Sequence, residues 1–430
     1  MFERYQGGES AILVHIDFPN HFQQQSCEDK QEFVELVRSA NITCLELLQS
    51  KKEKPEPAYF VGKGKLSEIK QRVKLLEAPL VLFNHQLSPA QEKNLEKELG
   101  CRVIDRIGLI LDIFAQRADT FEGKLQVELA QLKHLSTRLI RGWTHLERQK
   151  GGIGLRGPGE TQLETDRRLL RARMKWIDKR LLKVDKQRQQ SRKSRKKAQL
   201  PAVSLVGYTN AGKSTLFNEI TTAEVYAADK LFATLDPALR QVYWPETGKL
   251  VMADTVGFIR HLPHDLVAAF KATLQETRDA DLLLHVIDTS DERRDENIEQ
   301  VNNVLDQIGA DEVPVLQIYN KIDAVNGVKP RIDYNGEGVP IRVWLSALSG
   351  EGIPLLQKAI AAKMGESQLN CKLLLPPLAG KARALFFEND AVIHESMTSE
   401  GYWEMEVNLS KKEWHRIKRN SGLDLSLYIE

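Results

Sequence analysis

The pattern of apolar and polar residues predicts four successive regions along this chain of 430 residues. In region 1–106, short apolar runs alternate with amphipathic ones, which predicts a small α/β domain. Its last helix should span 88–100, because Ser88 suits the N-cap, Pro89 the first helical position and Gly100 the stop. Strands are expected at 11–18, 42–48, 79–85 and 101–105, and another helix at 31–40.

Region 107–199 has apolar residues at helical spacing and few elsewhere, which predicts an antiparallel hairpin of two long helices. A second helix over 162–197 would be about 50 Å long at 1.5 Å per residue, so much of it should stand in solvent. The glycine-rich run GGIGLRGPGE (151–160) lies between the helices and is expected at the hairpin tip. The expected seam consists of Leu125, Leu129, Leu132, Leu139 and Leu146 on the first helix, and Leu163, Leu170, Met174, Ile177, Leu181 and Val184 on the second.

Two glycine motifs in these regions suggest nucleotide binding only weakly. GIGLRG (152–157) matches GxGxxG, but the preceding HLERQKG (145–151) is charged and helical rather than an apolar strand, so we reject a dinucleotide site. GKGK (62–65) matches no complete phosphate loop, and a simple turn is the competing interpretation.

Region 200–366 reads as repeated strand–loop–helix units, with near-continuous apolar runs that are typical of a buried, mostly parallel, doubly wound sheet. Region 367–430 is expected to be a small α+β domain, with strand-like segments at 384–389 and 402–409 and a polar helix at 411–420. The strands expected in the larger region are 202–207, 249–255, 281–288, 313–320 and 341–347.

The composition and the charge distribution indicate where the protein works and what kind of partner it binds. No apolar run approaches the length needed to span a bilayer, and the N-terminus has no signal-peptide pattern, so we expect a cytoplasmic protein. Between Thr165 and Gln199, 15 Lys and Arg oppose 3 Asp, which favours a polyanion such as RNA over the alternative of a solvated helix face. The isolated cysteines Cys27, Cys44, Cys101 and Cys371 have no CxxC pair and are expected to be buried thiols in a reducing cytoplasm, with no disulfide or zinc role.

Region 200–366 contains an ordered set of phosphate-binding motifs. GYTNAGKS (207–214) follows an apolar strand and precedes a helix, the context of a phosphate loop whose backbone N–H groups cradle phosphates. Lys213 should neutralise the β and γ oxygens, and Ser214 should bind Mg²⁺. DTVG (254–257) should supply Asp254 for the magnesium shell and the Gly257 amide for the γ-phosphate.

Further motifs predict specificity for guanine. In NKID (320–323), Asp323 can accept hydrogen bonds from guanine N1–H and the N2 amine, which adenine does not offer together. Asn320 and Lys321 should brace this pocket, and the backbone of SAL (346–348) should contact guanine O6. In FATLDP (232–237), Thr234 can complete the Mg²⁺ shell when a γ-phosphate is present.

Two residues in these motifs bear on hydrolysis. Phe258 stands where many GTPases use a glutamine to orient water, so hydrolysis should be slow without a partner. Asn210 is either a turn residue or, as in some GTPases, an aid to binding a monovalent cation such as K⁺. The expected catalytic residues are Lys213, Thr234 and Gly257, and the expected metal ligands are Ser214 and Thr234. The expected nucleotide contacts are Gly207, Tyr208, Thr209, Asn210, Ala211, Gly212, Lys213, Ser214, Thr215, Phe232, Ala233, Thr234, Leu235, Asp236, Asp254, Thr255, Val256, Gly257, Asn320, Lys321, Ile322, Asp323, Ser346, Ala347 and Leu348.

Together with GGIGLRGPGETQLETDRR (151–168) and DTVGFIRHLPHDL (254–266), these motifs make the chain resemble the HflX family of bacterial GTPases. FVGKGK (60–65), LSPAQEKNLEK (87–97) and RIGLILDIFAQRA (106–118) extend the resemblance over about residues 1–366, whereas 370–430 matches poorly.

The resemblance implies a monomeric cytoplasmic factor that binds the large ribosomal subunit and splits stalled or idle ribosomes under stress when GTP is bound. It also implies that the glycine tip reaches towards the peptidyl-transferase centre, and that the N-terminal domain of some relatives binds ATP. Two alternatives are a tRNA-modification-type GTPase and an RNA-binding scaffold in which GTP is structural. The expected RNA contacts are Gly152, Gly154, Arg156, Gly157 and Gly159 at the tip and Arg188, Arg192, Lys193 and Lys196 on the basic helix.

Overall fold

The structure is a computed structural model in which the chain falls into two compact units. The first comprises Met1–Asp185, Ala228–Asp236 and His261–Phe270, and the second comprises Lys186–Ala227, Pro237–Arg260 and Lys271–Glu430. The structure describes all residues except 1–9, 19–25, 143–157, 198–199, 222–230, 233, 235–236, 246, 260–270, 390, 399–400 and 430. The finer division into domains 1–106, 107–199, 200–366 and 367–430 stays a prediction.

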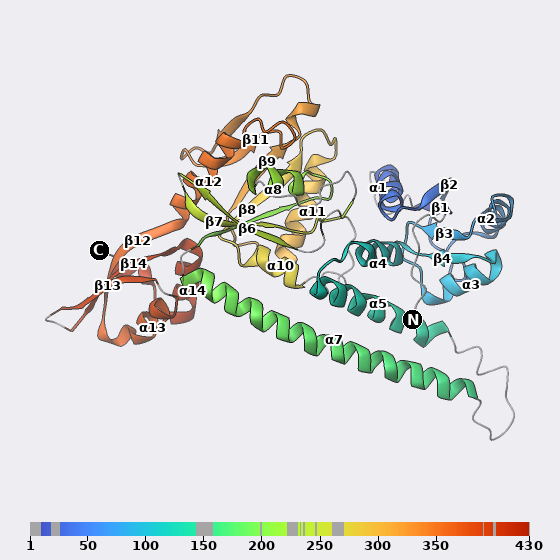
Figure 1. The fold of residues 1–430 in the computed structure, drawn as a ribbon, viewed down its shortest axis with the longest axis horizontal. Coiled ribbons are helices and arrows are strands. Elements are labelled where there is room, and N and C mark those ends of the chain that lie inside the picture. Colours follow the sequence, from blue (N-terminus) through green and yellow to red (C-terminus); the bar gives the residue numbers. More distant parts are fainter. Residues whose placement is uncertain are drawn as a thin grey trace. The chain divides into compact units, whose positions relative to one another are not determined.

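The first unit begins with a four-stranded parallel sheet of order β2-β1-β3-β4, which confirms the expected α/β domain (Figure 1). Helix α3 begins as predicted, because the Ser88 hydroxyl accepts from the Gln91 backbone N–H and the Gln91 side chain accepts from the Ser88 backbone. Gly100 ends this helix in the left-handed conformation. The elements are β1 (Ser10–Asp17), α1 (Ser26–Ser39), β2 (Thr43–Lys51), α2 (Lys63–Leu75), β3 (Leu80–Phe83), α3 (Pro89–Leu99), β4 (Arg102–Ile104) and α4 (Arg106–Arg117).

The GKGK segment (62–65) is not a simple turn. Gly62 is the N-cap of α2, and the remaining residues form the first turn of that helix. Helix α2 was not anticipated because its sequence is highly charged, and only Leu66, Ile69 and Val73 carry its buried face.

The predicted helical hairpin is formed by α5 (Phe121–Gly142) and α7 (Pro158–Lys197). Helix α7 has 40 residues, about 60 Å at 1.5 Å per residue, and it starts four residues earlier than expected. Arg138 of α5 donates to Glu92 (2.6 Å) and Asp105 (2.9 Å), which fastens the hairpin to the sheet domain. The predicted seam is confirmed for Leu125, Leu129, Leu132, Leu170, Met174, Ile177 and Leu181. The side chains of Leu139, Leu146 and Leu163 lie outside the described residues.

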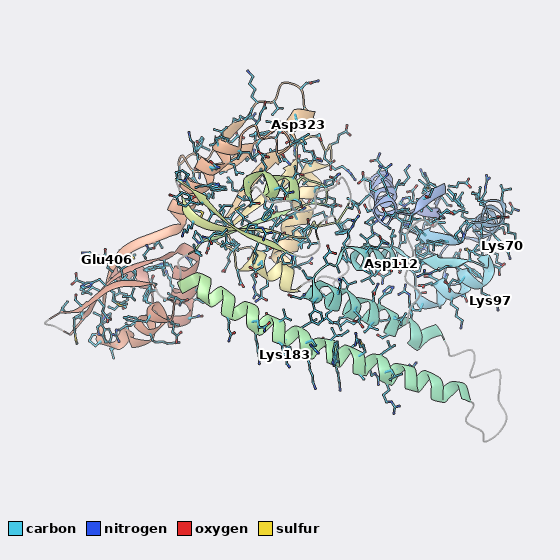
Figure 2. The ribbon with its side chains drawn as sticks, viewed as in Figure 1. Lys70, Lys97, Asp112, Lys183, Asp323 and Glu406 are labelled. Atoms are coloured by element: carbon cyan, nitrogen blue, oxygen red, sulfur yellow. The ribbon has the colours of Figure 1, made fainter. Side chains whose placement is uncertain are left out.

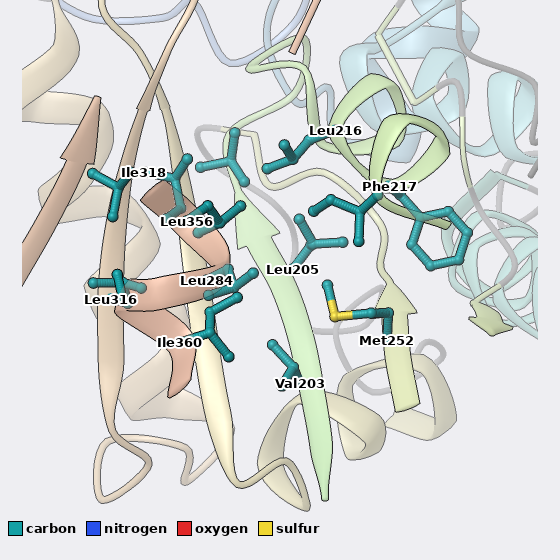
Figure 3. Close-up of a cluster of buried hydrophobic side chains, with 14 of the residues drawn as sticks. Val203, Leu205, Leu216, Phe217, Met252, Leu284, Leu316, Ile318, Leu356 and Ile360 are labelled. Atoms are coloured by element: carbon teal, nitrogen blue, oxygen red, sulfur yellow. The ribbon is translucent and has the colours of Figure 1, made fainter. Parts of the chain in front are cut away.

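The second unit contains a seven-stranded sheet of order β10-β11-β9-β8-β5-β7-β6. All five predicted strands are present and parallel to one another, while the edge strands β6 and β10 are antiparallel and were not predicted. Side chains from strands and from helices α8 and α12 form its core (Figure 3). The elements are β5 (Ala202–Gly207), α8 (Lys213–Thr221), β6 (Ala238–Trp244), β7 (Gly248–Asp254), α10 (Lys271–Arg278), β8 (Leu282–Asp288), α11 (Arg294–Gln307), β9 (Val315–Asn320), η1 (Ile322–Ala324), β10 (Arg331–Tyr334), β11 (Pro340–Trp344) and α12 (Ile353–Ser367).

A three-stranded antiparallel sheet of order β12-β14-β13 follows, with helices packed on one face. The strand predicted at 384–389 is wrong. This segment lies in α13, where Ala382 and Phe386, four residues apart, both point into the core. The strand at 402–409 and the helix at 411–420 are confirmed. The elements are β12 (Gln368–Leu375), η2 (Pro377–Ala379), α13 (Gly380–Glu388), β13 (Val392–Met397), β14 (Trp403–Ser410), α14 (Lys411–Ser421) and η3 (Leu425–Tyr428).

Candidate functional site

The predicted phosphate loop connects β5 to α8 at the carboxyl end of the sheet, and its two outer glycines are required by close contacts. A Cβ atom on Gly207 would lie 2.3 Å from the Val286 carbonyl oxygen. A Cβ on Gly212 would lie 2.3 Å from the Asn320 amide nitrogen, and both glycines have positive φ angles of 150° and 90°. Asn210 between them has a φ of 62°, so it occupies a turn position whichever role it has. The loop therefore packs directly on β8 and β9.

Lys213 begins α8 and is buried beneath the loop. Its Nζ donates to the carbonyl oxygens of Gly207 (3.1 Å) and Tyr208 (2.6 Å). Burial lowers the pKa of this ammonium group to about 8, against the opposing effect of the Asp254 carboxylate. His285 on β8 is also buried, and burial together with the Lys213 charge lowers its pKa to about 4, so the imidazole is neutral. The Lys213 ammonium group therefore has no charged imidazole beside it, although the nearby Lys321 charge also lowers its pKa.

Ser214 and Asp254 form the expected magnesium corner. The Ser214 hydroxyl donates to Asp254 Oδ2 at 2.7 Å, and the Asp254 side chain is completely buried. A hydroxyl beside a carboxylate at the end of a strand is an oxygen donor set of the kind that Mg²⁺ uses alongside phosphate oxygens and water. The neighbouring Thr255 is held by its own hydrogen bond to the Leu205 carbonyl (2.6 Å). The residues present therefore fit a magnesium ion.

Gly257 and Phe258 run alongside the phosphate loop. A Cβ on Gly257 would lie 2.8 Å from Thr209 Cγ2 and 3.0 Å from Lys213 Nζ, so only glycine fits. The Phe258 N–H donates to the Gly207 carbonyl (3.1 Å), and the Thr209 N–H donates to the Phe258 carbonyl (2.8 Å). The Phe258 side chain is buried. Backbone hydrogen bonds therefore fix position 258, where many GTPases have a water-orienting glutamine, and its side chain here is an apolar ring.

Asn320 links the base pocket to the phosphate loop. Its Nδ2 donates to the Ala211 carbonyl (2.9 Å), and its Oδ1 accepts from the Ala347 N–H (2.9 Å). This side chain thus holds three of the predicted motifs together. Lys321 is in the left-handed region, with a φ of 63°, and its ammonium group pairs with Asp288 at 2.7 Å. Asp288 was not predicted, although its place at the end of the apolar strand 281–288 was a usable signal.

Asp323 is exposed and lies in η1 just after β9 (Figure 2). Its Oδ1 accepts from the Ser346 hydroxyl at 2.5 Å, and the same Ser346 oxygen accepts from the Ser349 N–H (3.2 Å). The carboxylate is therefore oriented by one oxygen, and among the described residues its second oxygen has no hydrogen-bond partner. This is the arrangement that a base presenting two adjacent N–H donors requires.

The structure brings together 207–215, 254–257, 320–323 and 346–348 as predicted, although the Ile322 side chain is buried and Leu348 is largely exposed. The predicted segment 232–236 is grouped with the first unit. There the Phe232 ring packs edge-on against Phe114 at 4.6 Å, so this side chain is a core contact. The role of Thr234 stays a prediction, and Ala233, Leu235 and Asp236 lie outside the described residues.

The predicted RNA contacts are only partly described. Gly152, Gly154, Arg156 and Gly157 lie outside the described residues, whereas Gly159 is in the first turn of α7 rather than in a loop. Arg188, Arg192, Lys193 and Lys196 lie on α7, and their side chains are outside the description.

Two smaller predictions concern cysteines and membranes. Cys44, Cys101 and Cys371 are free thiols, but the expected burial is wrong, because Cys44 is exposed and Cys101 and Cys371 are only partly buried. The Cys27 side chain lies outside the described residues. Among the described residues no helix is long and apolar enough to cross a bilayer.

Comparison with known proteins supports the GTPase family predicted from the motifs, along nearly the whole chain. Residues 27–115 match the family "GTP-binding GTPase N-terminal", 117–195 match "GTP-binding GTPase Middle Region" and 202–321 match "50S ribosome-binding GTPase". The GTPase HflX of Escherichia coli K12 is 60% identical over 417 residues, covering 97% of both chains. The GTPase HflX of Magnetococcus marinus is 44% identical over 396 residues, covering 91% of both chains.

The chain belongs to the HflX GTPase family. A solved GTP-binding protein from Sulfolobus solfataricus, in complex with GDP, is 25% identical with a TM-score of 0.45, covering 84% of this chain and 99% of that chain. As an HflX GTPase, this chain binds GTP and hydrolyses it. The alternative of a scaffold in which GTP is only structural is therefore wrong. The tRNA-modification alternative is not supported, because the chain matches the HflX family along nearly its whole length.

The buried lysine leads to a pH-dependent affinity for GTP. Phosphate binding requires the Lys213 ammonium form, and its pKa of about 8 in the free protein means that this form is lost as pH rises. Binding must then take up a proton, so GTP affinity should fall roughly fourfold between pH 7 and pH 8.5. Fluorescence titration with a labelled GTP, kept below the pH at which guanine loses its N1 proton, measures this. A flat profile would contradict the lowered pKa. Lys213→Arg, which stays charged, should bind with no such slope.

Proposed function

We propose that this HflX GTPase binds the large ribosomal subunit and splits stalled or idle ribosomes under stress. The observation that carries the proposal is the basic helix α7, the second helix of the hairpin, which lies in the chain between the glycine-rich run 151–160 and the GTPase motifs. Its 40 residues give a helix of about 60 Å, longer than packing within one small domain requires. Support also comes from the family description "50S ribosome-binding GTPase" for residues 202–321.

The proposal assigns each part of the chain a task. The four regions 1–106, 107–199, 200–366 and 367–430 act as domains of a monomer that works in the cytoplasm on ribosomes. GTP is bound with Mg²⁺ through Ser214 and Thr234, and hydrolysis uses Lys213, Thr234 and Gly257. The tip glycines and Arg156 approach ribosomal RNA, where glycine permits close backbone contact and arginine adds a charged or stacking contact.

Replacing residues 152–157 with a Gly/Ser loop of equal length tests the function of the tip. The change leaves α7 intact, because that helix begins at Pro158. GTP affinity and unstimulated hydrolysis should stay near wild type, while release of free subunits from purified ribosomes on a sucrose gradient should be lost. Arg156→Ala provides a milder variant. If the loop variant splits ribosomes normally, the glycine-rich run serves only as a turn. If the variant loses GTP binding, the run belongs to the nucleotide site.

The basic end of α7 should bind ribosomal RNA through its phosphates. Reversing Arg188, Arg192, Lys193 and Lys196 to Glu should weaken co-sedimentation with large subunits and flatten the log–log salt dependence by roughly three units, about 0.7–0.9 for each of the four phosphate contacts. The matched control keeps the charge: Lys193→Arg with Lys196→Arg should bind as wild type with an unchanged slope. If the reversed variant binds as wild type, the helix has only a solvated face.

A further inference from the structure

The C-terminal domain contains an acidic segment, defined here as residues 384–410. It has six acidic residues and no lysine or arginine, in a chain that has 61 lysines and arginines overall. The segment includes β13 and β14, which form an antiparallel pair (Figure 1). RNA phosphates would be repelled by this charge, and a cationic partner would be attracted. The acidic residues are Glu388, Asp390, Glu395, Glu400, Glu404 and Glu406.

Strand β13 is an edge strand. It pairs with β14 on one side, and among the described residues no strand pairs with its other side. The opposite outer strand, β12, is partly covered, because Leu373 forms a bridge with Ile429 near the end of the chain. An uncovered edge presents alternating N–H and C=O groups, which another extended polypeptide can pair with.

Large apolar side chains surround this edge. Ile393 and Met397 on β13 are 61% and 68% exposed, and Leu378, just before α13, is 99% exposed. A Cβ on Gly401 would lie 3.9 Å from Pro377 Cγ, so the turn after β13 lies beside the η2 segment that carries Leu378. Clustered exposed apolar residues of this size mark an interaction surface more often than isolated ones do.

A built network holds the strand in place beside α13. Arg383 of α13 donates two hydrogen bonds to the Glu395 carboxylate, at 2.5 and 2.8 Å. Its guanidinium lies over the rings of Phe387, at 5.2 Å, and Trp403, at 5.0 Å. This ion pair leaves β13 preformed for pairing, which lowers the ordering cost of binding.

The open face of the sheet adds charge next to this edge. Glu406 on β14 (labelled in Figure 2) lies opposite Lys372 of β12 and His394 of β13 in the sheet register. All three residues are exposed. Glu404 is nearby and accepts from Ser396 at 3.1 Å. Glu404 and Glu406 therefore lie beside the apolar edge, with Lys372 as the cation opposite Glu406.

We propose that the outer edge of β13 docks an extended, lysine- and arginine-rich segment of a partner protein, which adds a strand to the sheet. The backbone edge selects a polypeptide, the apolar residues 393 and 397 anchor it, and the acidic segment selects a cationic one. The proposal rests on the proposed function, and on the ribosome the partner would be a basic protein of the large subunit. The C-terminal domain would then contact protein while the hairpin contacts RNA.

Site-specific photocross-linking tests which class of macromolecule lies at the edge. A benzophenone amino acid replaces Ile393 or Met397 in the full chain, which is mixed with purified large ribosomal subunits and a non-hydrolysable GTP analogue. Both positions should cross-link to a protein, and the same probe at Leu427, which is exposed in η3, should not. Cross-links to RNA alone, or none from a chain that co-sediments, would overturn the proposal.

A second test adds positive charge at the edge of β13 and measures whether binding to the subunits becomes weaker or stronger. Ile393→Lys with Met397→Lys should weaken binding to the subunits roughly tenfold, because it removes two apolar anchors and repels a basic segment. If RNA were the partner, the two added lysines would strengthen binding. Leu427→Lys is the matched control and should bind as wild type. GTP hydrolysis without ribosomes and the thermal midpoint should be unchanged in both, which excludes misfolding.

The outcomes separate the docking surface from the function on which it rests. A wild-type chain that does not co-sediment with the subunits refutes both. A wild-type chain that binds, with a double-lysine variant that binds equally well or better, refutes the docking surface alone.

Discussion

Asp323→Asn should lower the affinity for GTP on the order of 10³-fold, because a site built to pair with two base donors strongly rejects a mismatch. In the structure the Ser346 hydroxyl holds one carboxylate oxygen at 2.5 Å, which orients the group towards the base. An amide in the same place presents a donor where guanine presents its own N–H. The variant should instead favour xanthosine triphosphate, whose C2 carbonyl accepts from that amide.

Competition binding against a fluorescent nucleotide measures both affinities. The matched control is Asp311→Asn, an exposed carboxylate outside all the nucleotide motifs, and it should leave GTP affinity unchanged. Retention of full GTP affinity in the Asp323 variant would show that NKID (320–323) is not the base pocket.

Ribosomes should accelerate GTP hydrolysis by roughly 10³–10⁵-fold, the range that supplied groups contribute in related enzymes. The isolated protein lacks an internal means of orienting water at the usual position. Phe258 is apolar and buried, and its backbone is fixed by hydrogen bonds to Gly207 and Thr209. A single-turnover phosphate-release assay with and without purified large subunits measures the ratio. Fast turnover that ribosomes leave unchanged would contradict this expectation.

Potassium is tested separately in the same assay. Asn210 has the strained backbone of a turn residue, with a φ of 62°, which is compatible with either role predicted for it. If Asn210 helps to bind K⁺, replacing potassium with sodium should slow hydrolysis in both arms of the experiment. An unchanged rate would leave the asparagine as a turn residue only.

The motifs of the candidate nucleotide site and their places at strand ends could be predicted because each motif is local. The backbone of 207–214 must form a loop between an apolar strand and a helix, and this demand appears directly as glycines at fixed positions. The parallel strands could also be predicted, because strands buried on both faces are continuous apolar runs in the sequence. Hydrogen bonds between residues far apart in the sequence could not be predicted. One example is the Asn320 side chain, which joins Ala211 to Ala347.

The helical hairpin was also determined by the sequence, through a seam repeated at intervals of three and four residues. The Ser88 and Gly100 boundaries of α3 followed from capping chemistry that involves only neighbouring residues. Helix α2 was missed because three buried residues among many charged ones give a weak period.

In the C-terminal domain the sequence alone was least decisive. Segment 384–389 is apolar enough for either a strand or a helix, and only packing against Met405 and Val407 of the sheet selects the helix that buries Phe386. Strand β13 was not foreseen, because an edge strand with one solvated side has no continuous apolar run. The sequence by itself determined the GTPase motifs, the hairpin and the charge of each segment. The tertiary structure decided which segments are edges and which apolar side chains stay exposed, because both depend on what packs against them from elsewhere in the chain.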